Sequence, residues 1–125
     1  MAKEKFSLIN RIKSFAHAIN GLKLLFREEH NARVHLVVAI LVVIAGFVSE
    51  ISIIEWMMIT FAIGLVISIE ILNTAIEKTA DFISPERNEQ IKVIKDLAAG
   101  AVLVSTITSV IIGLLVFVPK LLQIL

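Results

Sequence analysis

Five polar side chains on one helical face form the most chemically capable group in the sequence. At about 100° per residue of an α-helix, they fall within about 60° of a common direction, while the aliphatic residues between them point elsewhere. They are Glu70, Asn73, Thr74, Glu77 and Asp81. Seven residues separate Glu70 from Glu77, or roughly 10 Å along the axis. The two carboxylates cannot share one ion directly, but they could hold two ends of a reaction.

This spacing is suited to proton transfer at one end and metal binding at the other. Glu70 could take a proton from a hydroxyl group, and Glu77 could bind a divalent cation. A hard cation such as Mg²⁺ takes one or two protein carboxylates together with substrate phosphates, and Glu28 or Glu29 could supply the second carboxylate. Lys95 could neutralise phosphate oxygens. Asp96 could orient the lysine or accept a hydrogen bond from the edge of a nucleotide base.

A less specific interpretation is that these charges form the solvated end of a helical hairpin, with Glu77 paired to Lys78 or another base. The five glycines are scattered, so neither a Walker A loop nor a dinucleotide-binding motif is present. The chain has no cysteine, and its three histidines lack metal-ligand spacing. We therefore expect His17, His30 and His35 to be interfacial polar residues.

The composition indicates which elements must position these residues. Of 125 residues, 58% are hydrophobic and 18% are charged, against about 45–50% and about 25% in soluble domains. The net charge of +1 gives no basic field of the kind that nucleic-acid binding needs. The composition excludes most soluble classes and indicates a membrane protein with no nucleic-acid partner.

Three long stretches are almost free of charge. Residues 34–49 and 97–119 carry no Asp, Glu, Lys or Arg, and residues 51–69 carry only Glu55. About 20 apolar residues span a bilayer, so we predict membrane spans at 32–49, 51–70 and 97–119. A soluble bundle is disfavoured because the chain is too small to cover three such helices with polar ones.

The basic residues predict the orientation. Seven precede the first uncharged stretch, residues 34–49: Lys3, Lys5, Arg11, Lys13, Lys23, Arg27 and Arg33. None lies between the first two spans, four lie between the second and third, and one follows. Because cytoplasmic segments carry the excess of Lys and Arg, we expect the N-terminus in the cytoplasm and the C-terminus outside.

The chain before the first span is predicted to be an amphipathic surface helix over residues 7–28. Its apolar residues step by three and four, which places them in one stripe: Leu8, Ile12, Phe15, Ile19, Leu22 and Phe26. Such a helix can lie in the headgroup plane, or it can pack against a partner through the stripe.

A helix break is predicted between the second and third spans. Pro85 disfavours helix at Ser84 and suits the first turn of a new helix with Ser84 as its cap. One helix should therefore end near Ile83. The next should start at once and run through Lys95 into the third span, making a cytoplasmic helical hairpin.

The segment Glu70-Ile-Leu-Asn-Thr-Ala-Ile-Glu77 resembles the signature of the prokaryotic diacylglycerol kinase family, which includes the undecaprenol kinases. The order of features along nearly the whole chain is also similar, including Lys95-Asp96 and the following Ala98-Ala-Gly-Ala101. The resemblance implies an all-α integral membrane homotrimer of the bacterial inner membrane. It also implies transfer of the γ-phosphate of ATP to a lipid hydroxyl at sites shared between protomers.

The same resemblance implies roles for individual residues. Glu70 matches the catalytic base, and Glu29 and Glu77 match the carboxylates that hold Mg²⁺ with ATP. The nucleotide site is expected to include Arg11, His17, Asn73, Glu86, Asn88, Lys95 and Asp96. The lipid substrate is expected near Arg11, Arg33 and Glu70.

Diacylglycerol and undecaprenol both remain possible substrates, although segments 52–56 and 117–121 look closer to the undecaprenol branch of the family. A second hypothesis is a small oligomeric transporter or channel in which Glu70 and Glu77 form an ion path. A third is a non-enzymatic scaffold, for which Glu70→Gln would be harmless.

Overall fold

The computed structural model describes residues 6–125, and residues 1–5, which include Lys3 and Lys5, lie outside the described part. The described chain is all-α, as predicted. Its helices are α1 (Leu8–Glu28), α2 (His30–Val48), α3 (Ile53–Ile83) and α4 (Glu89–Ile124).

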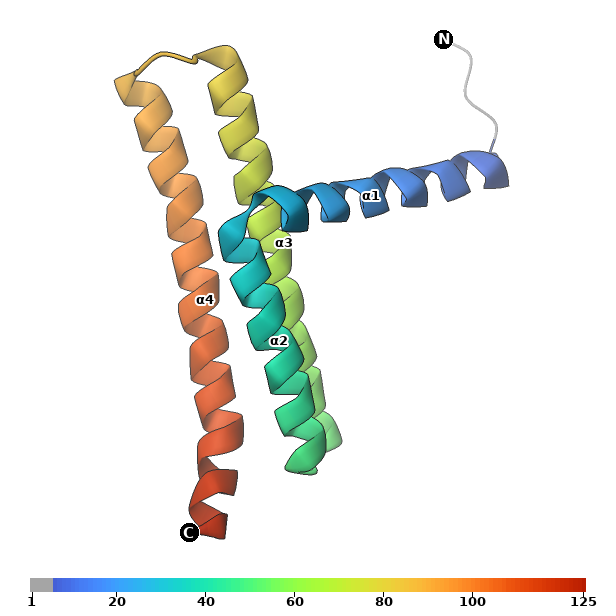
Figure 1. Ribbon diagram of the computed structural model, residues 1–125, viewed down its shortest axis with the longest axis vertical. Helices are drawn as coiled ribbons and strands as arrows, with labels where there is room; N and C mark the ends of the chain where they lie inside the picture. Colours follow the sequence, from blue (N-terminus) through green and yellow to red (C-terminus); the bar gives the residue numbers. More distant parts are fainter. Residues whose placement is uncertain (1–5) are drawn as a thin grey trace.

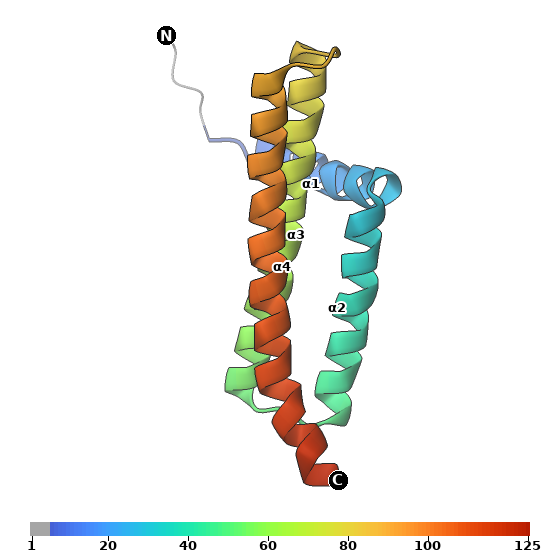
Figure 2. The same cartoon turned by 90° about the vertical axis from the view of Figure 1, so that its left-hand side faces the viewer.

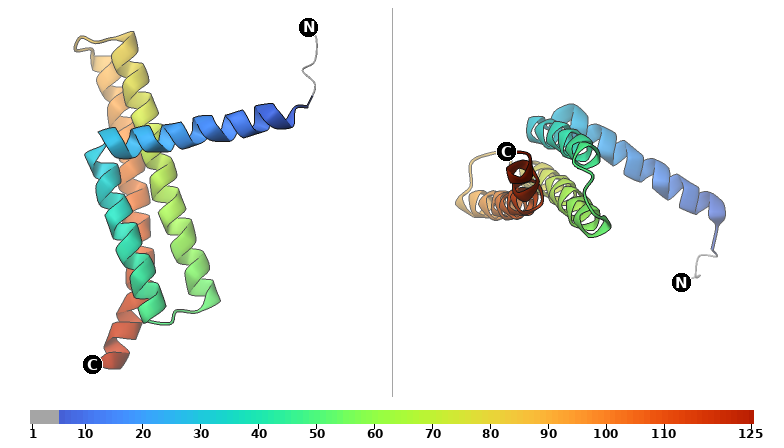
Figure 3. Two further views of the ribbon diagram at one scale, coloured as in Figure 1. Left: turned by 45° about the vertical axis from the view of Figure 1, so that its right-hand side comes forward. Right: turned by 90° about the horizontal axis from the view of Figure 1, so that it is seen from below.

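The two longest helices, α3 and α4, form an antiparallel hairpin that makes up the length of the molecule (Figure 1). Helix α2 runs beside the lower part of this pair, and Figure 2 shows it standing to one side. Helix α1 leaves the top of α2 at a steep angle and projects away from the bundle (Figures 1 and 3). The connected ends of α3 and α4 extend well beyond the level of α1.

Within the described residues, three helices, α2, α3 and α4, are long and apolar enough to cross a membrane, the same number as the spans that the sequence predicts. Many of their large apolar side chains are exposed in the single chain, as expected for surfaces that face lipid or other protomers. The 31 residues of α3 rise about 46 Å, more than the hydrocarbon core of about 30 Å. One end of α3 must therefore project beyond the apolar layer.

The connection between α3 and α4 corrects one prediction. Helix α3 ends at Ile83 as expected, but Ser84 is its C-cap and does not start the next helix. Helix α4 begins four residues later than Pro85, at Glu89, with Asn88 as its N-cap. The Asn88 Oδ1 atom accepts hydrogen bonds from the backbone N–H groups of residues 90 and 91, at 2.9 and 3.3 Å.

Helix α4 starts after Asn88 and not after Ser84 because two good capping residues compete for its start. Asparagine caps a helix as well as serine does, and the Ser84 hydroxyl is instead used within the turn, where it donates to the Glu86 carbonyl at 3.1 Å. From Asn88 onward α4 is continuous through Lys95 into the third predicted span, as expected.

Helices α3 and α4 approach closely because small side chains line their contact. Ala62 and Ala80 of α3 and Ala98 and Ser105 of α4 are all buried. The Ser109 hydroxyl of α4 donates to the Ala62 carbonyl of α3 at 3.2 Å. Small residues and interhelical hydrogen bonds are the usual means of joining helices in lipid, where apolar burial gives little preference for protein over lipid.

The far end of the bundle is tied together separately. Ser52 and Glu55 form a capping box that starts α3, and Glu55 also lies 3.4 Å from the Lys120 ammonium of α4. A Cβ atom at Gly46 would lie 2.6 Å from the Trp56 ring, so glycine is what lets α2 approach α3 here. Neither contact involves the acidic face of α3, which is the face that carries Glu70, Glu77 and Asp81.

Candidate active site

Glu70 is a buried carboxylate on α3, with 3% of the residue exposed. One turn further along the helix, Thr74 is also buried, and Asn73 is half-buried. Within the described residues, three side-chain oxygens on this stretch are buried without a hydrogen-bond partner: Glu70 Oε1, Asn73 Oδ1 and Thr74 Oγ1. Because buried polar atoms are normally hydrogen bonded, this face of α3 is suited to a polar ligand or to groups from another protomer.

The titratable side chain in contact with Glu70 is that of His35, on α2. Its Nε2 atom is 3.1 Å from Glu70 Oε1, although no hydrogen bond is formed to that oxygen. From the sequence, His35 was expected only to be an interfacial polar residue. A signal was present: His35 is near the start of one apolar stretch and Glu70 at the end of the next, so an antiparallel pair places them at the same depth.

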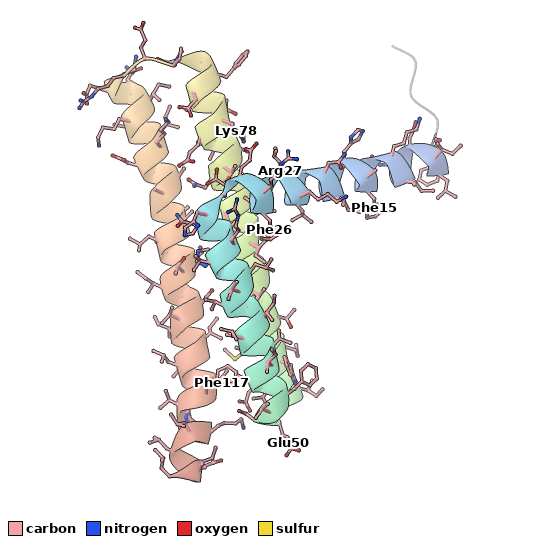
Figure 4. All side chains as sticks on the ribbon, in the orientation of Figure 1. Phe15, Phe26, Arg27, Glu50, Lys78 and Phe117 are labelled. Carbon is pink, nitrogen blue, oxygen red and sulfur yellow. The ribbon has the colours of Figure 1, made fainter. Side chains whose placement is uncertain are left out.

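The joint between α1 and α2 sits beside the acidic face of α3. Glu29 serves as both the C-cap of α1 and the N-cap of α2. Next to it, the Glu28 carboxylate lies 2.6 Å from the Lys78 ammonium of α3. The hydrogen bond from Lys78 lowers the pKa of Glu28 below its ordinary value. Figure 4 shows Lys78 next to the end of α1 that carries Phe26 and Arg27.

The two predicted metal carboxylates come from this joint and from α3. Glu29 and Glu77 are both half-buried. The pKa of Lys78, the residue that follows Glu77, is raised mainly by the hydrogen bond that Lys78 donates to Glu28, and the negative charge of Glu29 adds to this effect. The described residues contain no cluster of three or more metal-ligating side chains. One or two carboxylates are nevertheless what Mg²⁺ takes when phosphates complete its shell, so the donor set fits that ion.

The turn between α3 and α4 encloses a polar hollow of about 380 Å³. Four of the predicted nucleotide-site residues line it together: Glu86, Asn88, Lys95 and Asp96. Lys95 Nζ lies 2.5 Å from Asp81 Oδ1 across the hairpin, and Lys92 pairs with Asp96 at 2.6 Å. Asp81 was expected on the same helical face as Glu70, but its pairing with Lys95 was not predicted. Two ammonium groups at one hollow are suited to phosphate oxygens.

Three predicted site residues lie elsewhere in the single chain. Arg11 and His17 are exposed on the projecting part of α1, on either side of the Phe15 labelled in Figure 4. Fourteen residues separate Arg11 from the buried Leu25, or about 21 Å along the helix, so Arg11 does not reach Glu70 of its own chain. The Arg33 guanidinium donates to the carbonyls of residues 26 and 27, the former at 2.7 Å, and thereby caps α1.

An apolar groove of about 370 Å³ runs between α2, α3 and α4. His35 lines it together with aliphatic residues such as Val38 and Val66. The groove therefore leads from the apolar part of the bundle to the histidine that contacts Glu70. This places an apolar surface and a buried acid next to one another, as an enzyme acting on an amphipathic substrate needs.

Comparison with known proteins agrees with this arrangement. Residues 16–117 match the family described as "Prokaryotic diacylglycerol kinase". The chain is 48% identical over 121 residues to an undecaprenol kinase of Bacillus subtilis, covering 96% of this chain and 98% of that protein. It is 32% identical to a diacylglycerol kinase of Synechocystis, covering 93% of this chain and 67% of the relative.

A diacylglycerol kinase of Escherichia coli is 30% identical over 111 residues, covering 89% of this chain and 91% of the relative. The family match spans Glu29, His35, the acidic face of α3 and the hairpin hollow, whereas Arg11 lies before it. The three membrane-length helices and the match over most of their length lead to one conclusion. The chain belongs to the prokaryotic diacylglycerol kinase family, a family of lipid kinases.

Proposed function

We propose that the chain transfers the γ-phosphate of ATP to the hydroxyl group of undecaprenol, with Mg²⁺ bound alongside the nucleotide. The observation that carries this proposal is the buried Glu70 carboxylate. It contacts His35, which lines the apolar groove, and it belongs to the helix whose C-terminal end helps to form the polar hairpin hollow. Undecaprenol is favoured as the lipid because the relative named for it is 48% identical over nearly the full length of both chains.

Each residue group has a role that its position supports. Glu70 accepts the proton of the lipid hydroxyl as that oxygen bonds to the γ-phosphorus and the bond from phosphorus to the ADP oxygen breaks. Glu29 and Glu77 would hold the cation, which would supply neutralisation of the phosphate charge. Lys95, with Asp96, Glu86 and Asn88 around the hairpin hollow, orients the phosphates. Such a site works without a P-loop because phosphoryl transfer depends mainly on positioning and charge neutralisation.

The assembly we propose is a homotrimer in the bacterial cytoplasmic membrane, with the N-terminus and the α3–α4 turn in the cytoplasm. Two observations support sharing of sites between protomers. Arg11 lies about 21 Å along α1 from the buried Leu25, on the projecting part of the helix, and buried oxygens on α3 find no partner within the described residues. Helix α1, lying as an amphipathic helix at the membrane surface, would carry Arg11 and His17 toward a neighbouring site.

Diacylglycerol is the second candidate lipid, because relatives named diacylglycerol kinase are 30–32% identical to this chain. Both lipids carry a primary hydroxyl near the headgroup level, so the catalytic residues would be the same. The difference between them lies in the hydrocarbon part, which the apolar groove would contact. The choice between the two lipids therefore does not affect the role of Glu70.

The test is phosphorylation of both lipids side by side by the purified chain in mixed micelles with Mg·ATP. The proposal predicts higher kcat/KM for undecaprenol than for diacylglycerol. Higher kcat/KM for diacylglycerol would transfer the assignment to that lipid. No transfer to either lipid by a folded, ATP-binding protein would overturn the proposal altogether.

A further inference from the structure

A contact between a histidine and the proposed base joins two helices at the site. His35 Nε2 lies 3.1 Å from Glu70 Oε1, with 22% of the histidine side chain and 4% of the glutamate side chain exposed. His35 belongs to α2 and Glu70 to α3, so the contact joins two helices at the proposed reaction centre. It is the only ion-pair contact recorded for Glu70 within the described residues.

A carboxylate in this position needs a fixed orientation. The terminal torsion of a glutamate is broad, so its two oxygens can exchange places unless a neighbour holds one of them. Misplacement of a reacting group by about 1 Å can cost about 100-fold in rate. A hydrogen-bond donor at Oε1 would leave Oε2 free to face the substrate.

Other charged groups near His35 are engaged elsewhere. Arg33, on the same helix, is bonded to the last carbonyls of α1, and Glu28 at the end of α1 is paired with Lys78. Helix α4 carries no Asp, Glu, Lys or Arg from residue 97 to residue 119. His35 is therefore the group placed to orient Glu70.

We propose that His35 is a positioning residue for Glu70. In the reacting state its Nε2–H donates to Glu70 Oε1, and Glu70 Oε2 receives the lipid proton. The lipid oxygen then bonds to the γ-phosphorus while the bond to the ADP oxygen breaks. Catalytic hydrogen bonds are often poorly aligned before the substrate is bound, which accounts for the close contact without a hydrogen bond in the single chain. This inference rests on the proposed kinase function.

Two nearly isosteric substitutions test it. In His35→Gln an amide nitrogen can occupy the place of Nε2, whereas in His35→Asn the amide reaches only the place of Nδ1. We expect His35→Asn to lower kcat by about tenfold or more, in line with misplacement of the base, with the KM for Mg·ATP unchanged. His35→Gln should recover most of the lost kcat. Both should unfold at similar temperatures in detergent, because they differ by one methylene group.

The proposal is overturned if His35→Asn keeps the wild-type kcat, or if His35→Gln is as slow as His35→Asn. His30→Gln is the matched control, since His30 is an exposed residue of the same helix without a proposed role, and it should leave kcat unchanged. Failure of the proposed function would look different, because the wild-type chain would then phosphorylate neither lipid.

A double-mutant cycle separates positioning from a purely structural role. If His35 acts through Glu70, adding His35→Asn to Glu70→Gln should cause no further loss of the residual rate. A structural role would lower the rate in both backgrounds by the same factor. Equal losses would therefore contradict the proposal even if the single variants behave as expected.

Discussion

At the scale of single residues, the site is defined by which charges have partners and which do not. Lys78, Lys92 and Lys95 each have a carboxylate within 2.6 Å. Glu70 instead is buried against His35, with Oε1 lacking a hydrogen bond within the described chain. The paired charges stabilise the helices and their contacts, whereas Glu70, the buried acid without a hydrogen bond, is the one available for chemistry.

The Glu28–Lys78 ion pair gives a pH-dependent prediction. Because the pKa of Glu28 is lowered in the folded chain, the pair contributes stability above the ordinary pKa of 4.5. This contribution is lost as the pH falls through the lower, folded-state pKa. NMR titration should give a Glu28 midpoint below 4.5 in the wild type and a higher midpoint in Lys78→Met. Lys23→Met, a change at an exposed lysine of α1, should leave it unmoved, and equal midpoints in all three proteins would exclude the pair in solution.

Glu70 could be singled out from sequence, whereas the contacts around it could not. An acid at the end of an apolar stretch is a functional candidate because its burial is costly. The partner His35 is 35 positions away, and only the relative depth of α2 and α3 brings the two together. Arg33 was expected at the lipid, but in the single chain its guanidinium bonds the end of α1. The sequence does not show that those carbonyls lie within its reach.

At the scale of helices, span length predicted the architecture and local capping decided the details. A small chain has little other way to accommodate three long, nearly uncharged stretches than as membrane-length helices. The three long apolar helices could therefore be foreseen. The start of α4 could not, because Ser84 and Asn88 are both good caps and the turn geometry selects Asn88.

Asn88 is expected to have two functions that substitution can separate. Asn88→Ala should destabilise the start of α4 by about 0.5–2 kcal/mol through loss of the cap, seen as a lower unfolding temperature in detergent. Asn88→Ser should restore stability, because serine also caps. If Asn88 also binds the nucleotide, both variants should show a higher KM for ATP. Equal instability of the two variants would contradict the capping role, and an unchanged KM would contradict the nucleotide role.

At the scale of the whole molecule, the projecting α1 supports the proposal that sites are shared between chains. Helix α1 projects away from the bundle (Figure 3), and its residues Arg11 and His17 are exposed. The trimer is an expectation from the family resemblance. The exposed apolar faces are the same whether they meet lipid or another protomer.

Shared sites predict complementation between two inactive variants. If Arg11 serves the Glu70 of a neighbouring protomer, Arg11→Ala and Glu70→Gln should each be impaired alone. Mixed trimers assembled from both should regain activity, because some sites then receive an intact Arg11 and an intact Glu70. The measurement is lipid phosphorylation after the two variants are unfolded together and refolded as a mixture. Activity no higher than the average of the separate variants would place each site within one chain.

The central claim is that Glu70 is the base in phosphoryl transfer to a lipid, and Glu70→Gln tests it most directly. The substitution keeps size and burial but removes the basic carboxylate, which typically contributes about 10²- to 10⁴-fold. We predict a loss of kcat of this size toward undecaprenol, with ATP binding and thermal stability retained. Glu50→Gln, at the opposite end of the molecule (Figure 4), should be fully active. A Glu70→Gln enzyme within a few-fold of wild type would contradict the account.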